Sequence, residues 1–158
     1  MEVSDLKICT LGVEHLNTFV DMRMALFREL GEISNNEDIT ELITSTRHYF
    51  TANIGENLLC WGIIVDEKIV SVASLCLFSR IPYKENLSGK EGYILNVYTL
   101  PEYRGEGMAK ALINTIINYA KTNNLTKLWL NSSEEGERVY KNYGFEKVEN
   151  AMERPLSR

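Results

Sequence analysis

The sequence predicts one α/β domain with a mixed, mainly antiparallel central sheet and helices on both faces. Three observations favour this class. First, the spacing of apolar residues alternates along the chain between two residues, typical of strands, and about 3.6 residues, typical of helices. Second, residues 58–78 have the pattern of a hairpin of two apolar strands. Third, residues 92–131 have the pattern of a strand, a helix and a strand in succession. A βαβ unit of that length implies two parallel strands joined by a right-handed crossover. The length, 158 residues, favours a single domain over residues 1–158.

The first half begins with one short strand and two helices. Residues 6–11 roughly alternate between apolar and polar, which is typical of a strand. From residue 13 to residue 30 the apolar side chains recur at spacings of three and four, and Gly31 is placed to end that helix. A second stripe over residues 39–50 predicts another helix, which ends near Gly55.

The predicted hairpin follows. Residues 58–65 and 69–78 are apolar and partly β-branched, and residues 66–68 form the short turn between them. Residues 79–91 contain Pro82, Gly89 and many charged side chains, so we expect a loop there. A loop of that length is often functional or mobile.

The second half carries the βαβ unit and a C-terminal helix and strand. In order, we expect a strand over 92–100, a helix with its apolar stripe over 109–120, a strand over 125–131, a short helix over 137–143 and a weak last strand over 145–152. A short, weak strand at the edge of a sheet leaves backbone groups open to pairing. We therefore expect a homodimer.

Composition and charge narrow the function classes. Seventeen Lys and Arg against 22 Asp and Glu give a net charge of −5, and 44% of the residues are hydrophobic. This is ordinary for a globular domain, and a net acidic chain is poorly suited to nucleic acid, whose phosphates bind basic surfaces. The acidic residues 1–5 lead into no apolar segment, and the longest apolar run, 69–78, is too short to span a bilayer. We expect a cytoplasmic protein without membrane or nucleic-acid partners.

The cysteines and histidines do not suggest a metal site. Cys9, Cys60 and Cys76 are odd in number and form no C-x-x-C pair, which favours reduced thiols over disulfides or zinc ligands. His15 and His48 have no partner at metal-ligand or catalytic-triad spacing. We expect no metal cofactor.

Residues 101–109, between the strand and the long helix, are rich in glycine. Gly105, Gly107 and the small Ala109 allow the backbone to approach a ligand closely and to direct its amides outward. The following helix adds unpaired N–H groups and the positive end of its dipole. Together they predict an anion site suited to phosphate or pyrophosphate. Arg104 either adds a side-chain cation or points to solvent.

Two common phosphate motifs do not match this loop. A Walker A loop needs Gly-Lys-Ser/Thr where Gly107-Met108-Ala109 stands, and a dinucleotide fingerprint needs a third glycine where Lys110 stands. The loop taken alone is consistent with either a plain tight turn or a ligand site, and a general nucleotide-binding protein remains an alternative.

A second motif and the order of elements favour a particular ligand. Arg104-x-x-Gly107-x-Ala109 follows a strand end, and Tyr140-Lys141-Asn142-Tyr143-Gly144-Phe145 comes about thirty residues later. This combination resembles the GNAT superfamily of acetyl-CoA-dependent N-acetyltransferases, with its Q/R-x-x-G-x-G/A loop and its Y-x-x-x-G-F motif. The resemblance covers the whole chain in element order. It implies a GNAT-like fold and transfer of an acetyl group from acetyl-CoA to a primary amine.

The resemblance also implies roles for particular residues. The strand around Val97, Tyr98 and Thr99 would pair with the pantetheine arm and offer backbone N–H groups to the oxyanion. The loop residues Arg104, Gly105, Glu106, Gly107, Met108 and Ala109 would hold the pyrophosphate. Tyr140 would lie beside the thioester sulfur as the general acid. Ser133 stands where family members often carry a cofactor-contacting asparagine, which weakens that contact.

The sequence leaves the general base and the acceptor open. Glu91, Glu29 and Glu32 are candidates for the base, each with the alternative of a solvated charge, and a water chain is a further option. The acceptor is a small-molecule or peptide amine, and the acidic balance mildly favours a cationic one. The alternative function is a non-catalytic CoA-binding or regulatory module with the same fold.

Overall fold

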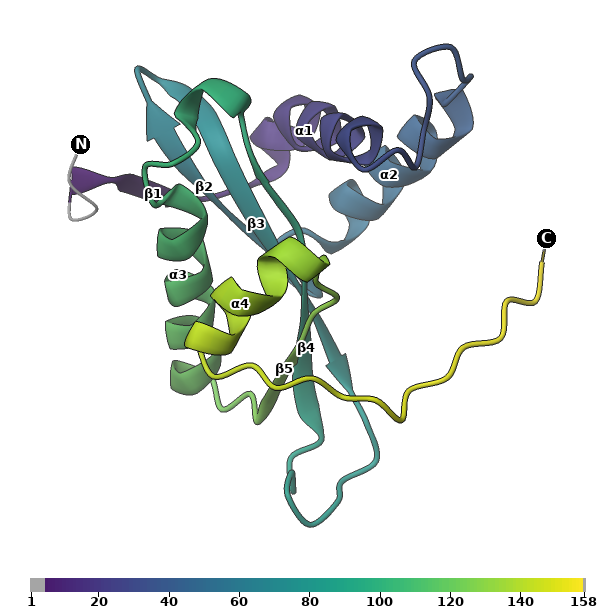
Figure 1. Ribbon diagram of the computed structural model, residues 1–158, viewed down its shortest axis with the longest axis vertical. Coiled ribbons are helices and arrows are strands. Elements are labelled where there is room, and N and C mark those ends of the chain that lie inside the picture. Colours follow the sequence, from purple (N-terminus) through teal and green to yellow (C-terminus); the bar gives the residue numbers. More distant parts are fainter. Residues whose placement is uncertain (1–4, 158) are drawn as a thin grey trace.

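The computed structural model describes residues 5–157 (Figure 1). Residues 1–4, which contribute to the expectation that the chain has no signal peptide, lie outside that range. Five strands form one sheet in chain order: β1 (Lys7–Thr10), β2 (Leu58–Val65), β3 (Lys68–Ser79), β4 (Lys90–Thr99) and β5 (Lys127–Trp129). All neighbouring pairs are antiparallel except β4 and β5, which are parallel. The predicted mixed, mainly antiparallel sheet is therefore confirmed.

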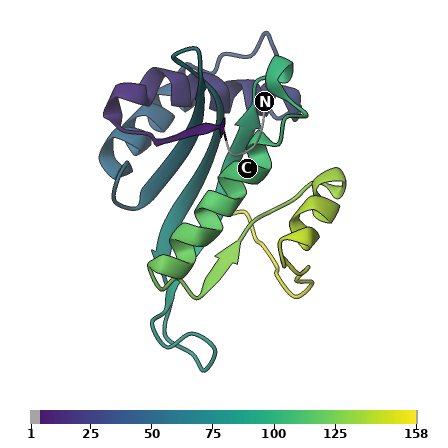
Figure 2. The ribbon, with the colours of Figure 1, turned by 90° about the vertical axis from the view of Figure 1, so that its left-hand side faces the viewer.

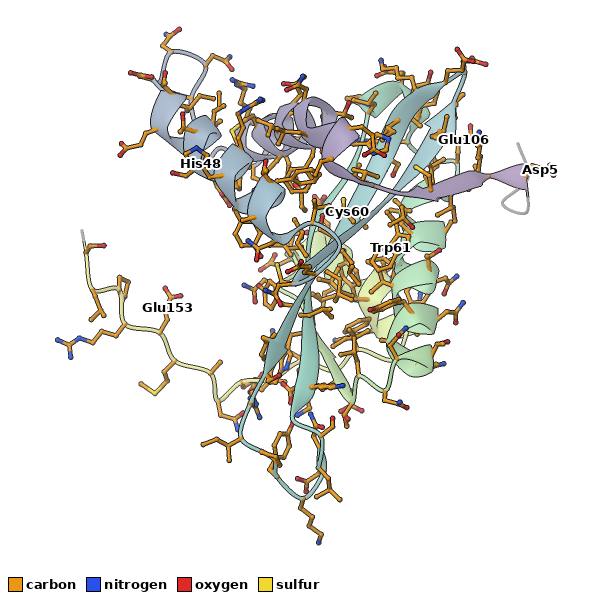
Figure 3. All side chains as sticks on the ribbon, turned by 180° about the vertical axis from the view of Figure 1, so that it is seen from behind. Asp5, His48, Cys60, Trp61, Glu106 and Glu153 are labelled. Carbon is orange, nitrogen blue, oxygen red and sulfur yellow. The ribbon has the colours of Figure 1, made fainter. Side chains whose placement is uncertain are left out.

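Helices cover both faces of this sheet, as the sequence predicts (Figures 1 and 2). One face carries α1 (Leu16–Glu29), which follows the 3-10 turn η2 (Val13–His15), and α2 (Thr40–Asn53); the other carries α3 (Met108–Thr122) and α4 (Glu134–Asn142). Two separate apolar cores result. The neighbouring residues Cys60 and Trp61 of β2 point to opposite faces, with Trp61 on the side of α3 (Figure 3).

The βαβ unit is formed by β4, α3 and β5. The apolar stripe of α3 packs on the sheet, and Leu112, Ile113 and Ile116 are almost completely buried. The parallel register joins Glu91 to Lys127 and Tyr93 to Trp129. This part of the predicted topology is confirmed, although β5 is only three residues long.

The predicted last strand is wrong. Residues 145–152 form no strand, and the segment from residue 146 onward is exposed and runs away from the body of the protein (Figure 1). Its charged residues, among them Glu146, Lys147 and Glu149, leave too few apolar side chains for a strand to bury. The argument for a homodimer from a weak edge strand loses its basis.

A buried carboxylate joins β4, β5 and the loop between β3 and β4. Glu91 is fully buried and accepts hydrogen bonds from Tyr83 Oη at 2.6 Å, Trp129 Nε1 at 2.7 Å and Asn86 Nδ2 at 3.1 Å. Arg80 Nε lies 3.5 Å from the same carboxylate. Burial raises the pKa of Glu91, but these hydrogen bonds and the charge of Arg80 outweigh it, so the net pKa lies below its ordinary value. Glu91 is a charged structural residue that fixes the start of β4.

We predict that Glu91→Ala destabilises the fold by about 3 kcal/mol, because three buried donors and a cation lose their acceptor. Urea unfolding at pH 7 measures this. Because the pKa of Glu91 is lowered in the folded state, its charged form stabilises the fold fully at pH values above the unfolded-state pKa of about 4.3. This stabilisation is lost as the pH falls through the folded-state pKa. Glu91→Gln should reduce the acid dependence of stability; an unchanged acid dependence would contradict this role.

Candidate functional site

The candidate site lies where β4 and β5 separate. Their pairing ends at Tyr93 and Trp129, and β4 continues to Thr99 without a neighbouring strand on that side among the described residues. The register with β3 shifts in the same region: Leu95 pairs with Ser74 and Tyr98 pairs with Val72. Two residues of β4 therefore stand opposite one residue of β3, which is a β-bulge. The bulge and the separation together leave half of β4 with an open edge.

Alternation along β4 determines which backbone groups face the open edge. The amide of Leu100 donates to Val70 O at 2.9 Å, so it points toward β3. In an antiparallel pair the next residue directs its backbone groups the other way. Thr99 and Val97 therefore present their amides to the open edge, whereas the backbone of Tyr98 faces β3. Of the three strand residues predicted to bind the cofactor, the alternation thus directs the amides of two, Val97 and Thr99, toward the open edge.

Asn96, in the bulge, is a residue that the sequence analysis did not single out. Its φ of +54° lies in the left-handed region, which asparagine tolerates better than most residues. Its side chain is about 95% buried, and neither Oδ1 nor Nδ2 has a hydrogen-bond partner among the described residues. Asparagine is depleted in strands, so an asparagine within an apolar run was the available signal.

The glycine loop presents a row of free amides. It begins with the 3-10 turn η3 (Pro101–Tyr103), and Gly105 and Gly107 have φ values of +83° and +79°. The amide of Ala111 donates to Gly107 O at 3.0 Å, which is the first bond of the α3 ladder. None of the amides of residues 105–110 donates to an acceptor within the described chain. These amides stand at the positive end of α3, so the loop is suited to an anion.

Arg104 is engaged elsewhere. Its amide donates to Pro101 O at 3.3 Å, and its Nε donates to Thr99 O at 2.9 Å. Both terminal nitrogens donate to the carboxylate of Glu29, at 2.6 and 2.8 Å, while the guanidinium lies 5.4 Å from the centre of the Tyr98 ring. Arg104 thus ties the end of α1 to the end of β4. The free amides begin at Gly105.

Tyr140 projects from α4 toward β5. It lines a cavity of about 870 Å³ between α4, β5 and the C-terminal half of α3, and its ring meets the edge of Phe145 at a centroid distance of 5.9 Å. The phenol makes no hydrogen bond within residues 5–157, and burial raises its pKa. The neighbouring Tyr143 is instead hydrogen-bonded through its hydroxyl to Lys110 O at 3.4 Å. Tyr140 is therefore a protonated, uncommitted phenol at neutral pH.

Ser133 has a local role. It is the N-cap of α4, and its Oγ accepts from the amide of Gly136 at 3.1 Å. Serine is a preferred N-cap residue, and the acidic Glu134, Glu135 and Glu137 in the first turn suit the helix dipole. This explains why α4 starts at Glu134, three residues before the predicted start.

Two of the three candidate bases are committed to other contacts. Glu91 is the buried structural carboxylate described above. The hydrogen bonds from Arg104 lower the pKa of Glu29, which makes it a poor proton acceptor. Glu32 is exposed just beyond α1. The described part of the chain shows no carboxylate poised as a base at the opening between β4 and β5.

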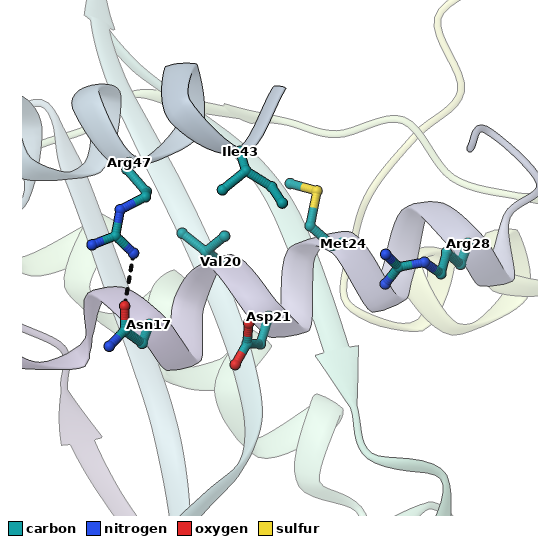
Figure 4. A pocket seen from close by; sticks show the side chains of 7 residues that line it. All are labelled: Asn17, Val20, Asp21, Met24, Arg28, Ile43 and Arg47. Atoms are coloured by element: carbon teal, nitrogen blue, oxygen red, sulfur yellow. Dashed lines mark hydrogen bonds between the residues drawn. The ribbon is translucent and has the colours of Figure 1, made fainter. Parts of the chain in front are cut away.

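A second hollow lies between α1 and α2, away from these residues (Figure 4). It measures about 520 Å³, and at one end Arg47 donates to Asn17 Oδ1 at 2.7 Å. Val20, Met24 and Ile43 form its apolar floor, and Arg28 lies toward the other end. None of the residues predicted to bind cofactor or catalyse lines it. The predicted site residues therefore gather at the opening of β4, the glycine loop and α4, and not at this hollow.

Comparison with known proteins agrees with this geometry. The sequence profile of the acetyltransferase (GNAT) family matches residues 19–145, so the chain belongs to that family. A predicted acetyltransferase from Clostridium acetobutylicum, solved with acetyl-CoA, is 28% identical over 96% of both chains with a TM-score of 0.85. A search among curated proteins returns no match.

More distant structures share the fold. A GCN5-related N-acetyltransferase from Ralstonia eutropha JMP134 is 21% identical, covers 96% of this chain and 98% of its own, and has a TM-score of 0.84. A glucosamine-6-phosphate N-acetyltransferase from Arabidopsis thaliana is 18% identical, with coverages of 96% and 99% and a TM-score of 0.71. The GNAT fold predicted from the sequence is confirmed.

Two further properties bear on the predicted partners. Among residues 5–157, no helix has the length and apolar character needed to cross a bilayer. Over the same range, no three His, Cys, Asp or Glu side chains gather into a group suited to a metal ion. The cysteines Cys9, Cys60 and Cys76 are free thiols.

We predict that Gly107→Val weakens the binding of CoA about tenfold or more. A branched side chain strains the left-handed backbone at this position and crowds the amides that face the ligand. Gly55→Val is the matched control, since Gly55 has a φ of +85° with open space around its Cβ and lies between α2 and β2. Calorimetric titration of both folded variants with CoA decides it; equal affinities would contradict the phosphate-loop assignment.

Proposed function

We propose that this protein transfers the acetyl group of acetyl-CoA to a primary amine by direct attack on the thioester. One observation carries the proposal: the open edge of β4 leads straight into a loop of free amides at the start of α3. An extended arm that ends in a pyrophosphate has complementary groups for both parts of this surface. Membership of the acetyltransferase (GNAT) family supports the same conclusion.

The chain's residues divide the binding between two kinds of contact. The amide of Thr99, nearer the glycine loop, pairs with the pantetheine arm as a neighbouring strand would, which leaves the amide of Val97 for the thioester end. The amides from Gly105 to Ala109 receive the pyrophosphate, aided by the dipole of α3. Arg104 contributes by holding the loop against α1, and Ser133 by fixing the start of α4.

The reaction needs an oriented amine, a stabilised oxyanion and a proton for the leaving sulfur. The amine nitrogen forms a bond to the carbonyl carbon, the carbon–sulfur bond breaks, and the amine loses one proton while the thiolate gains one. The backbone N–H group of Val97, at the end of this stretch farther from the glycine loop, stabilises the charge on the carbonyl oxygen. Tyr140 gives its phenolic proton to the thiolate, and water takes the proton of the amine.

We predict that Tyr140→Phe lowers kcat about 10²-fold with little change in the KM for acetyl-CoA, because the lost proton transfer acts only in the transition state. Thiolate is a good leaving group, so we expect the low end of the range for general acids. Tyr143→Phe is the control, since Tyr143 caps the C-terminal end of the same helix and its hydroxyl is already bonded to Lys110 O. Steady-state thiol release under a saturating amine measures both.

Three outcomes would argue against the proposal. A loss of less than threefold in Tyr140→Phe would remove Tyr140 as the acid. A rise in KM alone would make it a binding residue. If CoA binds and no amine in a broad panel releases thiol above the hydrolysis rate, the protein is a CoA-binding module without this activity.

The pH profile gives an independent check on Tyr140. Burial raises the pKa of Tyr140 above its usual value of about 10, so the proton-bearing form persists across the neutral and mildly basic range. kcat/KM should therefore rise with pH as the acceptor amine loses its proton and should not fall again below about pH 10. A descending limb at a pH well below about 10 that persists in Tyr140→Phe would show that another group supplies the proton and would contradict this assignment.

A further inference from the structure

Arg23 is a half-buried arginine whose guanidinium has no polar partner. It projects from α1, and its guanidinium lies 4.6 Å from the centre of the Phe27 ring. Within residues 5–157 it makes no hydrogen bond and has no carboxylate oxygen within 4.0 Å. Arg47, Arg80 and Arg104, by contrast, each contact a polar partner. Burying an unpaired cation is unfavourable, so its retention calls for an explanation.

The surroundings of Arg23 place it beside the opening between β4 and β5. Burial lowers the pKa of Arg23, while Cys76, Glu32 and Tyr49 act in the opposite direction, and the group stays charged at neutral pH. Tyr49 Oη and Cys76 Sγ are 3.4 Å apart, so α2 meets β3 here. Cys76 is paired with Tyr93 on β4.

Tyr93 connects this cluster to the site. It is the last residue of β4 that pairs with β5, and paired residues of neighbouring strands project from the same face of a sheet. Arg23 therefore lies over the face that carries α1 and α2, and β3, which carries Cys76, runs about 5 Å from β4, the strand that borders the opening. The loop and the start of α3 approach the opening from the other face. An acceptor that reaches the opening from the face of α1 passes Arg23.

Two carboxylates near this face already have cationic partners, whereas the guanidinium of Arg23 has no polar partner among the described residues. Glu29 is held by Arg104, and Glu91 is held by Arg80 and three hydrogen-bond donors. Glu32 attracts Arg23 from beyond ion-pair distance. A molecule bound here meets the half-buried guanidinium of Arg23 and the exposed side chain of Tyr49.

We propose that Arg23 binds an anionic group of the acceptor, so that the substrate carries an amine at one end and a carboxylate or phosphate several bonds away. The guanidinium offers a planar fork of N–H donors that fits either anion, and Tyr49 Oη supplies a further donor. This inference rests on the proposed acetyl transfer and names the substrate class for it. The net acidity of the chain favours a cationic acceptor, and the amine end of such a substrate meets that preference.

Matched pairs of amines test the proposal. Thiol release from acetyl-CoA is measured with 4-aminobutyrate against butylamine, with O-phosphoethanolamine against ethanolamine, and with putrescine as a dication. We expect the wild type to prefer at least one anionic member over its neutral partner by about tenfold or more in kcat/KM. Arg23→Gln should abolish that preference with little effect on the neutral amines.

The controls separate this inference from the function on which it rests. Arg28→Gln removes a cation from the same helix at the α1–α2 hollow and should keep the preference (Figure 4). Arg23→Lys, which keeps the charge and loses the fork, should retain part of it. The role of Arg23 is overturned if the wild type uses neutral amines or putrescine as well as the anionic ones. It is also overturned if Arg23→Gln keeps the preference. Either result leaves the proposed acetyl transfer unaffected.

A binding readout covers the case in which no amine reacts or Arg23→Gln does not fold. The side-chain N–H signals of Arg23 in the wild type with CoA bound are followed by NMR during titration with 4-aminobutyrate and, separately, with O-phosphoethanolamine. We expect saturable shifts for at least one of them and none with butylamine. The absence of shifts for both anions overturns the proposal.

Discussion

The separation of β4 from β5 is the constraint on which the rest of the structure depends. A strand inside a sheet satisfies its backbone groups on both sides, whereas the second half of β4 does so on one side only. Because Val97 and Thr99 present amides at an open edge, an extended ligand gains hydrogen bonds there without displacing a protein strand. The bulge at Asn96 belongs to the same device, since it changes the register just before the open stretch.

Two contacts hold this opening in shape from its two ends. Glu91 joins the first residues of β4 to Trp129 of β5, so the strands remain paired up to the point of separation. Arg104 joins the last residues of β4 to Glu29, so α1 is tied to the strand end beside the glycine loop. Both contacts engage carboxylates that were candidate bases, so the mechanism that we propose uses backbone amides and Tyr140 instead.

The elements whose formation depends on neighbouring residues in the chain were predictable from the sequence. The helical stripe of α3, the glycines at positive φ and the hairpin each depend on residues close together in the chain. The roles of Glu29 and Glu91 were not predictable, because their partners Arg104 and Trp129 lie 75 and 38 residues away. The expected last strand failed for a related reason: a strand needs a partner, and nothing within residues 145–152 reports whether β5 supplies one.

The family motifs indicated which residues of the site would bind a ligand. The structure adds which of their polar groups already have hydrogen-bond partners within the protein and which do not. Arg104 matches the motif, yet both its amide and its guanidinium are hydrogen-bonded within the protein. Arg23 and Asn96 match no motif, yet they carry polar groups that lack partners in the described chain. A motif identifies positions, whereas unsatisfied hydrogen-bonding capacity identifies what those positions can still bind.

The pair between Arg104 and Glu29 also links α1, which carries Arg23, to the glycine loop. It is partly exposed, with side-chain accessibilities of 41% and 46%, so dissolved ions screen it. Raising the ionic strength would loosen α1 from the glycine loop even for an uncharged acceptor. Part of the salt dependence of turnover would then come from the loosened contact between α1 and the loop, whatever the charge of the substrate. Turnover of neutral amines, measured over a range of salt concentrations, isolates this part.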